Sequence, residues 1–341
     1  MSQNRFDEYY DIRRARMDEI PEIMDFINTF WRKGHILGVN RSFFDYEMVT
    51  NGEVNVVVSK TRDSDQIDGM IGYLPCSNDS TKLDTWGVIW KTKPDAKPML
   101  GIEMKKRFCE ITGARSHLGT GANPETAVPL LRRILHYYSA KMKHYYRLGD
   151  LKEYEICTVK HKDIPPYKDK GELKIKLLPT AEKLEHFFDF SSVEDCWPYK
   201  DFWYYNRRFY EHPIYQYEVW GLSGENTKAF FVTRVLHYLN HAALSIVDYA
   251  GDASLFSQCG QFFDQIVTEN AYEYVDFYFD GFDEEAVQEA GFLKLEEDDT
   301  NILPAYFSPF VKSNIDIYVT SQDCDHQYRF FKADGDQDRP N

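Results

Sequence analysis

The chain repeats one order of sequence patterns twice, at a spacing of 160 residues. The stretch GTGANPETAV, residues 119–128, has an echo in FDGFDEEAV, residues 279–287. Gly121 and Gly281 differ by 160 positions (281 − 121 = 160). The same shift aligns two further pairs of segments, 69–71 with 229–231 and 86–88 with 246–248. A constant shift favours two copies of one unit over the alternative, an undivided α/β chain with coincidental spacing.

The residue pattern in each copy predicts the same order of elements: strand, helix, three strands, helix, strand, helix and strand. Alternating apolar residues indicate strands, and apolar residues three or four positions apart indicate helices. In the first half we expect strands at 53–61, 68–76, 83–92, 114–122 and 141–148, and helices after Met17, after Pro98 and at 123–139. In the second half we expect the matching elements within 173–190, 216–222, 228–236, 242–251, 254–270 and 272–295.

The length of 341 residues predicts two domains, because single hydrophobic cores rarely grow so large. With 43% hydrophobic residues the chain has enough apolar material for two cores. Residues 151–172 are polar, rich in lysine and contain Pro165-Pro166, which is typical of a linker. We therefore expect an α/β (α+β) fold with a first domain at 1–150, a linker at 151–172 and a second domain at 173–341.

The net charge of −15 argues against nucleic acid and anionic lipid as partners. The six cysteines form no C-x-x-C pair, so we expect buried free thiols and no metal site. No run of residues is long and apolar enough for a membrane span, and the N-terminus has no apolar signal segment. These features predict a cytoplasmic protein without membrane insertion, and they leave its oligomeric state open.

The order of elements resembles the GNAT fold, the superfamily of acyl-coenzyme A-dependent N-acyltransferases, over nearly the whole chain. Phrases such as GTGANPETAVPLL, KMKHYYRL and KADGDQDRPN are similar to bacterial two-unit GNAT-like proteins found with surface-polysaccharide genes. The resemblance implies two tandem GNAT-like domains, each a mixed central sheet flanked by helices. It also implies that acetyl-coenzyme A or another acyl-coenzyme A is the co-substrate, and that its diphosphate lies at the helix after the fourth strand.

The loop before the helix after Pro98 supplies the expected cofactor residues. A diphosphate needs free amides at a helix start, close backbone approach and positive charge. Lys93, Lys97 and Gly101 meet these needs, although Glu103 stands where the GNAT motif has its second glycine. The alternative interpretation is a solvated lysine-rich turn.

The resemblance places three candidate catalytic residues in the first half. His117 lies on the fifth strand, Asn123 caps the next helix, and Tyr137 and Tyr138 end that helix, where Tyr138 is the candidate acid for the leaving thiolate. Each also has a structural explanation as an edge histidine, a helix cap or packing tyrosines.

The corresponding loop of the second half is acidic. Asp248 and Asp252 bracket a glycine without a lysine or arginine in the loop, which would repel a diphosphate. We expect Asp248, Asp252 and Asp280 to bind an acceptor instead, a small-molecule amine or amino sugar. Alternating aspartates in the tail (Asp334, Asp336, Asp338) lack the glycine and glutamate of a calcium loop, so no metal is expected.

The sequence therefore predicts an acyltransferase that moves an acyl group from acyl-coenzyme A to an amine, with an amino sugar of surface-polysaccharide biosynthesis as one acceptor. Two alternatives stay open. One is a Fem-type transferase, which is also built from two GNAT-like units and uses aminoacyl-tRNA. The other is a decayed scaffold that binds a carbohydrate or a partner without catalysis.

Overall fold

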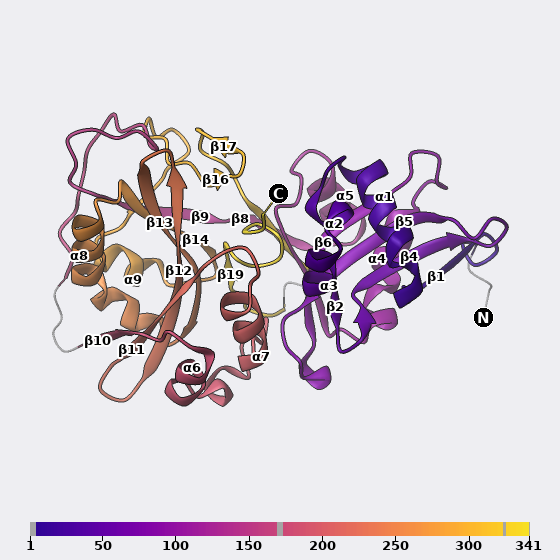
Figure 1. Cartoon of the computed structure of the whole chain (residues 1–341), viewed down its shortest axis with the longest axis horizontal. Coiled ribbons are helices and arrows are strands. Elements are labelled where there is room, and N and C mark those ends of the chain that lie inside the picture. Colours follow the sequence, from indigo (N-terminus) through magenta and orange to yellow (C-terminus); the bar gives the residue numbers. More distant parts are fainter. Residues whose placement is uncertain (1–4, 169–172, 323–324, 341) are drawn as a thin grey trace. The chain divides into compact units, whose positions relative to one another are not determined.

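A computed structural model describes residues 5–168, 173–322 and 325–340 (Figure 1). The chain forms two compact units. The first contains the described residues up to Ser139 and a short segment that begins at Thr320. The second runs from Ala140 to Val319 and from Gln327 to Pro340. Each unit is built around one mixed sheet.

The first half of the sequence follows the expected order of elements. Its strands are β1 (Tyr10–Arg14), β2 (Val49–Thr50), β3 (Glu53–Val54), β4 (Val56–Thr61), β5 (Ile67–Pro75), β6 (Asp84–Thr92), β7 (Ser116–Thr120), β8 (Tyr138–Lys141) and β9 (Lys143–Leu148). Its helices are α1 (Ile20–Phe26), α2 (Ile36–Val39), α3 (Arg41–Met48), α4 (Leu100–Thr112) and α5 (Ala127–Ile134).

The second half repeats that order and adds a strand-rich end. Its strands are β10 (Lys174–Leu177), β11 (Glu218–Ser223), β12 (Lys228–Tyr238), β13 (His241–Gly251), β14 (Tyr274–Asp280), β15 (Leu293–Lys294), β16 (Tyr306–Phe307), β17 (Phe310–Val311), β18 (Tyr318–Ser321) and β19 (Phe330–Phe331). Its helices are α6 (Ala181–Phe187), α7 (Phe202–Tyr205), α8 (Gly260–Asn270) and α9 (Glu284–Glu289).

The two sheets have equivalent strand orders. The first is β1-β4-β5-β6-β7-β18-β8 and the second is β10-β11-β12-β13-β14-β9-β15. In each sheet the fourth and fifth strands are parallel, and the strands before them are antiparallel. The sixth strand of each sheet comes from the other half of the sequence, since β18 joins the first sheet and β9 joins the second.

Because of this exchange, the two sheets do not divide the sequence at residue 150, where the first predicted domain ends. The strand expected to close the first half, at 141–148, lies in the second sheet, where it pairs with β14 from Tyr274↔Leu148 to Phe279↔Lys143. The expected linker is also partly packed. Ile156 and Cys157 are buried, and their amides donate to the Glu273 carboxylate at 2.9–3.0 Å. Residues 169–172 lie outside the described chain.

Both sheets carry a β-bulge at the same place on the fourth strand. The pairing slips at Val88, between Gly72 and Tyr73 of β5, and at Val247, between Val232 and Thr233 of β12. The shift between copies is 160 residues in the third strand (232 − 72 = 160) and 159 in the fourth (247 − 88 = 159). The constant shift predicted across three strands is therefore wrong by one residue in β6 and β13.

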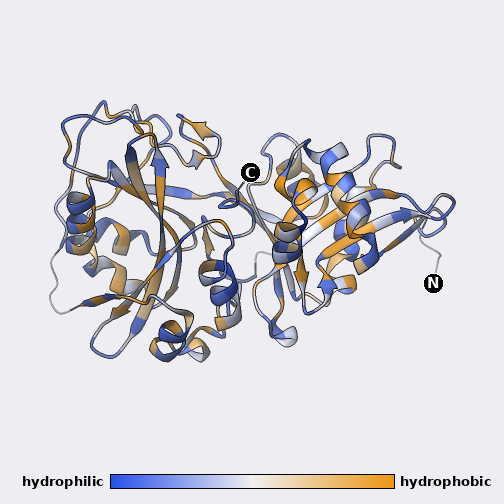
Figure 2. Cartoon of the chain, in the orientation of Figure 1, coloured by the Kyte–Doolittle hydropathy of each residue, from blue (hydrophilic) through white to orange (hydrophobic). Residues whose placement is uncertain are grey.

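Helices cover both faces of each sheet, and apolar residues fill the spaces between. Figure 2 shows orange segments on the strands and on the helices that cover them. In the first unit one core lies against α1 and α3 and includes Phe44 and Val88. A second core lies against α4 and includes Met104 and Phe108.

The helix expected at 123–139 is shorter than predicted. Starting at Pro124 would put Pro129 deep inside the helix, where its ring meets the carbonyl four residues earlier. Instead Asn123 Oδ1 accepts from the amides of Glu125 and Thr126 at 2.9 and 3.0 Å in a turn, and α5 starts at Ala127. Pro129 then falls in the first turn, where no amide is needed.

Candidate functional site

The parallel pair at the centre of each sheet diverges partway along its length. In the first sheet the pairing of β6 with β7 ends at Gly87↔Gly119, and β6 continues to Thr92. In the second sheet the pairing of β13 with β14 ends at Ile246↔Phe277, and β13 continues to Gly251. We call these two divergences the first splay and the second splay.

The second splay is filled by the end of the chain itself. β19 pairs with β14 at Phe279↔Phe331, while β9 pairs with the opposite edge of β14 at the same residue. The tail therefore lies on the edge of β14 that faces β13. The amide of Ala333 also donates to the carbonyl of Val247 at 2.9 Å, so the tail bonds to both diverging strands.

Buried charges fix the tail in the second splay. Lys332 Nζ donates to Ser245 Oγ at 3.0 Å and lies 3.7 Å from Asp276 Oδ2. Lys200 Nζ lies 2.5 Å from Asp334 Oδ1 and 2.7 Å from Asp248 Oδ2. Burial raises the pKa of Asp334, an effect that Lys200 opposes and the neighbouring Asp248 strengthens.

The first splay has no such occupant. In the described part of the chain no strand pairs with β6 beyond Gly87 on the side of β7. Trp90, Lys91 and Thr92 at the end of β6 are only half-buried. At the shift of 159 the matching residues of β13 are Tyr249, Ala250 and Gly251, of which Tyr249 and Ala250 are buried and Gly251 is half-buried. The two halves therefore share a fold but differ in the accessibility of the fourth strand.

The start of α4 fits a diphosphate in part. α4 has 13 residues, and within the described chain the amides of Gly101 and Ile102 make no hydrogen bond. Such free amides at a helix start bind anions. Lys97 Nζ has no carboxylate partner in the described chain and lies 3.3 Å from the centre of the Tyr9 ring. Its amide donates to Tyr10 Oη at 3.1 Å, which holds the loop against β1.

Two of the predicted cofactor residues are engaged elsewhere. Lys93 forms an ion pair with Asp68 at 3.2 Å. A Cβ at Gly101 would lie 2.9 Å from Trp90 Nε1, so packing against the indole already explains this glycine. Glu103 is bound by Arg107 at 2.7 Å, which offsets its negative charge near the helix start.

The predicted catalytic residues do not form one cluster. His117 is buried on β7, with Nδ1 3.1 Å from Thr85 Oγ1 and Nε2 2.6 Å from Lys105 Nζ. Asn123 is exposed in the turn before α5. Tyr138 does not end a helix, because the chain leaves α5 at Ile134 and His136 has a left-handed φ of 58°; it begins β8 instead.

The acidic residues predicted to bind an acceptor have three different environments. Asp248 is fully buried and paired with Lys200. Asp252 accepts from the amide of Ser254 at 3.0 Å and caps a short 3-10 helix. Asp280 ends β14 beside β19. The expectation that no cation compensates Asp248 is wrong, because Lys200 lies 48 residues away in sequence and the fold brings it there.

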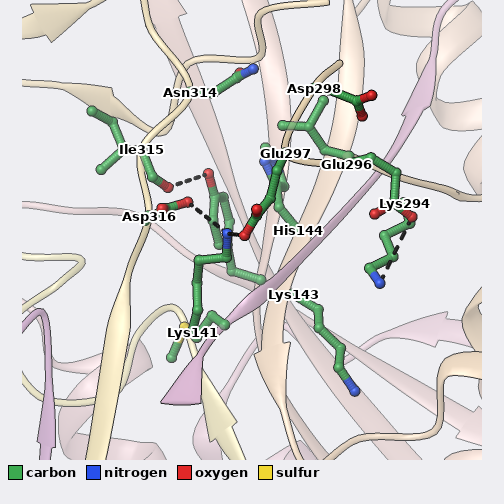
Figure 3. Close-up of a pocket in the computed structure, with 13 residues that line it drawn as sticks. Lys141, Lys143, His144, Lys294, Glu296, Glu297, Asp298, Asn314, Ile315 and Asp316 are labelled. Atoms are coloured by element: carbon green, nitrogen blue, oxygen red, sulfur yellow. Dashed lines mark hydrogen bonds and ion pairs between the residues drawn. The ribbon is translucent and has the colours of Figure 1, made fainter. Parts of the chain in front are cut away.

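Two large cavities of the second unit are lined by none of the predicted catalytic residues. One, of about 1140 Å³, is bordered by Lys141, Lys294, Glu296, Glu297 and Asp316. Figure 3 shows Lys141 between Glu297 and Asp316, so its charge is already satisfied at 2.5 and 3.4 Å. The other, of about 1020 Å³, lies at the end of β13 and includes Asp252, Lys228 and Arg329. These two cations further correct the prediction of a purely acidic loop.

Two further features are absent from the described residues. No helix there is long and apolar enough to cross a membrane. No group of three or more histidine, cysteine or acidic side chains is placed to hold a metal ion in the same part of the chain.

The comparisons with known proteins define the class of fold. No protein-family model matches the sequence, and no curated protein matches it. A GCN5-related N-acetyltransferase from Anabaena variabilis aligns with 92% of this chain and 72% of its own, at a TM-score of 0.56 and 9% identity. Yeast (Saccharomyces cerevisiae) N-myristoyltransferase with bound myristoyl-CoA aligns with 95% of this chain and 79% of its own at 10% identity, with a TM-score of only 0.43. The alignment with the Anabaena protein shows that the chain has a GNAT-like fold.

Sequence reasoning missed the residues that distinguish the two halves. The tail offered a weak signal, since YRFFKA at residues 328–333 has the pattern of a short strand, but the partner of that strand could not be identified from local pattern. Lys105 and Lys200 gave no signal, because a lysine in a polar-looking segment is usually exposed.

Proposed function

We propose that this chain is an acyl-coenzyme A-dependent N-acyltransferase that binds its acyl donor in the first half. The observation that carries the proposal is the difference between the two splays. An extended pantetheine arm can pair with the edge of β6 beyond Gly87, whereas the tail already occupies that position beside β13. The GNAT-like fold supports the reaction class, since the aligned Anabaena protein is an N-acetyltransferase by name.

The residues that would hold the donor follow from the start of α4. The amides of Gly101 and Ile102 face the helix start without partners in the described chain, and Lys97 supplies a cation without a competing carboxylate. Together they offer the diphosphate hydrogen bonds and charge. The acceptor is an amine, and an amino sugar is the first acceptor class to assay.

Calorimetric titration with acetyl-coenzyme A tests this proposal. We expect one binding site per chain in the wild type. Lys97→Glu should weaken binding about ten-fold or more, because a charge-assisted contact is lost and a like charge replaces it. Lys152→Glu is the matched control, since Lys152 is exposed in the second unit and forms no hydrogen bond or ion pair within the described chain; acetyl-coenzyme A should bind this variant as tightly as it binds the wild type.

Three results would contradict the proposal. If the wild type gave no heat on titration with acetyl-coenzyme A, the proposed acyl donor would be wrong. Two sites per chain would mean that the tail leaves the second splay open. Equal weakening by Lys97→Glu and Lys152→Glu would indicate a general charge effect rather than a site at α4.

A second candidate, a binding protein without catalysis, is favoured by the engaged state of Lys93 and Gly101. The same titration separates the two, because a protein of this kind would give no heat with acetyl-coenzyme A. A thermal-shift response to sugars in that case would support it.

A further inference from the structure

Lys105 is a buried amine without a carboxylate partner. It lies on α4 and is only 9% exposed. Within the described chain its ammonium forms no ion pair, and its contacts are His117 Nε2 at 2.6 Å and the Trp90 ring at 5.2 Å. Burying a cation without an opposite charge is costly, and a methionine would fill the same space without that cost. The amine at this position therefore indicates a chemical use.

A chain of hydrogen bonds sets the state of the neighbouring imidazole. Thr85 Oγ1 donates to the carbonyl of Ser116 at 3.1 Å. Its single proton is thereby used, so Thr85 Oγ1 must accept from His117 Nδ1–H. His117 Nε2 then carries no proton, and it accepts a hydrogen bond from Lys105 Nζ. Both ring nitrogens of His117 thus have hydrogen-bond partners. Among these three residues, Lys105 is the one whose side chain has unused donor positions.

The hydrogen-bonded residues Thr85, His117 and Lys105 lie at the point where the first splay opens. A Cβ at Gly87 would lie 3.0 Å from both Cε1 and Nε2 of His117, so the imidazole packs directly on the last paired residue of β6. Lys105 contacts both that imidazole and the ring of Trp90, which belongs to the end of β6 that is not paired with β7. Trp90 is held in place by its Nε1–H bond to the carbonyl of Gly101 at 3.2 Å.

We propose that Lys105 is the acid–base group of the first splay and that His117 and Thr85 are the residues that position it. This inference rests on the proposed acyl transfer. When the acceptor nitrogen attacks the thioester carbon, a C–N bond forms and the C–S bond breaks, and the electron pair of that bond leaves with sulfur. The nitrogen loses one proton to the Lys105 amine, and the thiolate takes one proton back from the resulting ammonium. Lys105 ends each turnover in its starting state.

The surroundings of Lys105 suit such an exchange. Burial lowers the pKa of Lys105 to about 7, while Cys109 on the same helix opposes the shift. The other titratable group that faces it is His117 on β7, whose pKa burial lowers well below its ordinary value. An amine that titrates near neutral pH can both accept and return a proton at the working pH.

Lys105→Met tests the assignment against Lys106→Met, a change to the exposed neighbour on the same helix. We expect kcat/KM of the wild type for acyl transfer to rise with pH through about 7. Lys105→Met should lower kcat about a hundred-fold, remove this inflection and leave acetyl-coenzyme A binding unchanged. Lys106→Met should keep both the rate and the inflection. Thr85→Val should keep part of the rate and move the inflection by roughly half a pH unit, because His117 loses its acceptor.

A measurement independent of activity separates this inference from the proposed function. The lysine side-chain signals of isotopically labelled protein are titrated by NMR, and the Lys105 signal is identified by its absence in Lys105→Met. A midpoint near 7 supports the inference. An ordinary midpoint above 10, or a Lys105→Met enzyme with the wild-type pH profile, overturns it. Failure of acetyl-coenzyme A to bind the wild type would instead overturn the proposed function, whatever the NMR titration gives.

Discussion

Gly101 illustrates how one residue satisfies two different physical demands. The sequence predicts a glycine there so that a phosphate can come close, and the structure gives it a packing reason, because the Trp90 indole occupies the space of a side chain. Asn123 Oδ1 likewise accepts from the two amides of its turn. At a single position, the type of residue limits which interactions are possible. It does not tell whether the residue contacts a ligand or another part of the protein.

Lys200 gives a prediction at this scale. Its ammonium is shared by Asp248 and Asp334, all three side chains being buried. Lys200→Met removes the ammonium that the two carboxylates share, and we expect the free energy of unfolding to fall by roughly 3–5 kcal/mol near pH 8. Chemical denaturation of the full chain, followed by circular dichroism, measures the loss.

The pH dependence of that loss follows from the raised pKa values. Burial raises the pKa of both Asp248 and Asp334, so the folded state holds protons that the unfolded state releases as pH rises above about 4. Protonated carboxyls need no cation, and the loss in Lys200→Met should therefore be smaller at pH 5 than at pH 8. Lys152→Met is the control. Equal losses at the two pH values would mean that the carboxyls are not the cause.

Among the elements, the short strand β19 has more effect than its length suggests. It fills the space between β13 and β14, and the amide of its neighbour Ala333 donates to the carbonyl of Val247. A strand of two residues thereby covers the edge of β13 that would otherwise face the second splay.

Ala333→Pro tests the role of this segment. Proline removes the amide that bonds to Val247, and a buried carbonyl without a donor costs about 1–3 kcal/mol. We expect a lower midpoint of denaturation for Ala333→Pro than for Ala333→Gly, which keeps the amide. If the glycine variant were as unstable as the proline variant, chain entropy or the lost methyl group would be the cause instead of the hydrogen bond.

At the scale of the whole molecule, the exchange of β9 and β18 ties each sheet to both halves of the sequence. A fragment of residues 1–150 keeps β9 away from its sheet and lacks β18, which lies between β7 and β8 in the first sheet. Each missing or unpaired strand exposes a sheet edge that promotes association.

We therefore expect the fragment 1–150 to unfold without a cooperative transition, or to aggregate, under conditions in which the full chain is stable. Circular dichroism during thermal denaturation and size-exclusion chromatography measure this. A monomeric fragment with a sharp transition would show that the first half folds without β18, and that a division near 150 describes a real domain.

The sequence by itself determined the class and order of elements in both halves. The spacing of apolar residues is a local property, so it predicted the strands that became β4 to β7 and β11 to β14 and the helix after Pro98. Only the tertiary structure decided which strand joins which sheet, that the tail closes the second splay, and that Lys105 and Lys200 are buried. These features depend on contacts between residues far apart in sequence, such as Lys200 with Asp334 and Lys332 with Ser245. Local pattern carries no information about such partners, because pairing and burial arise only when the chain folds.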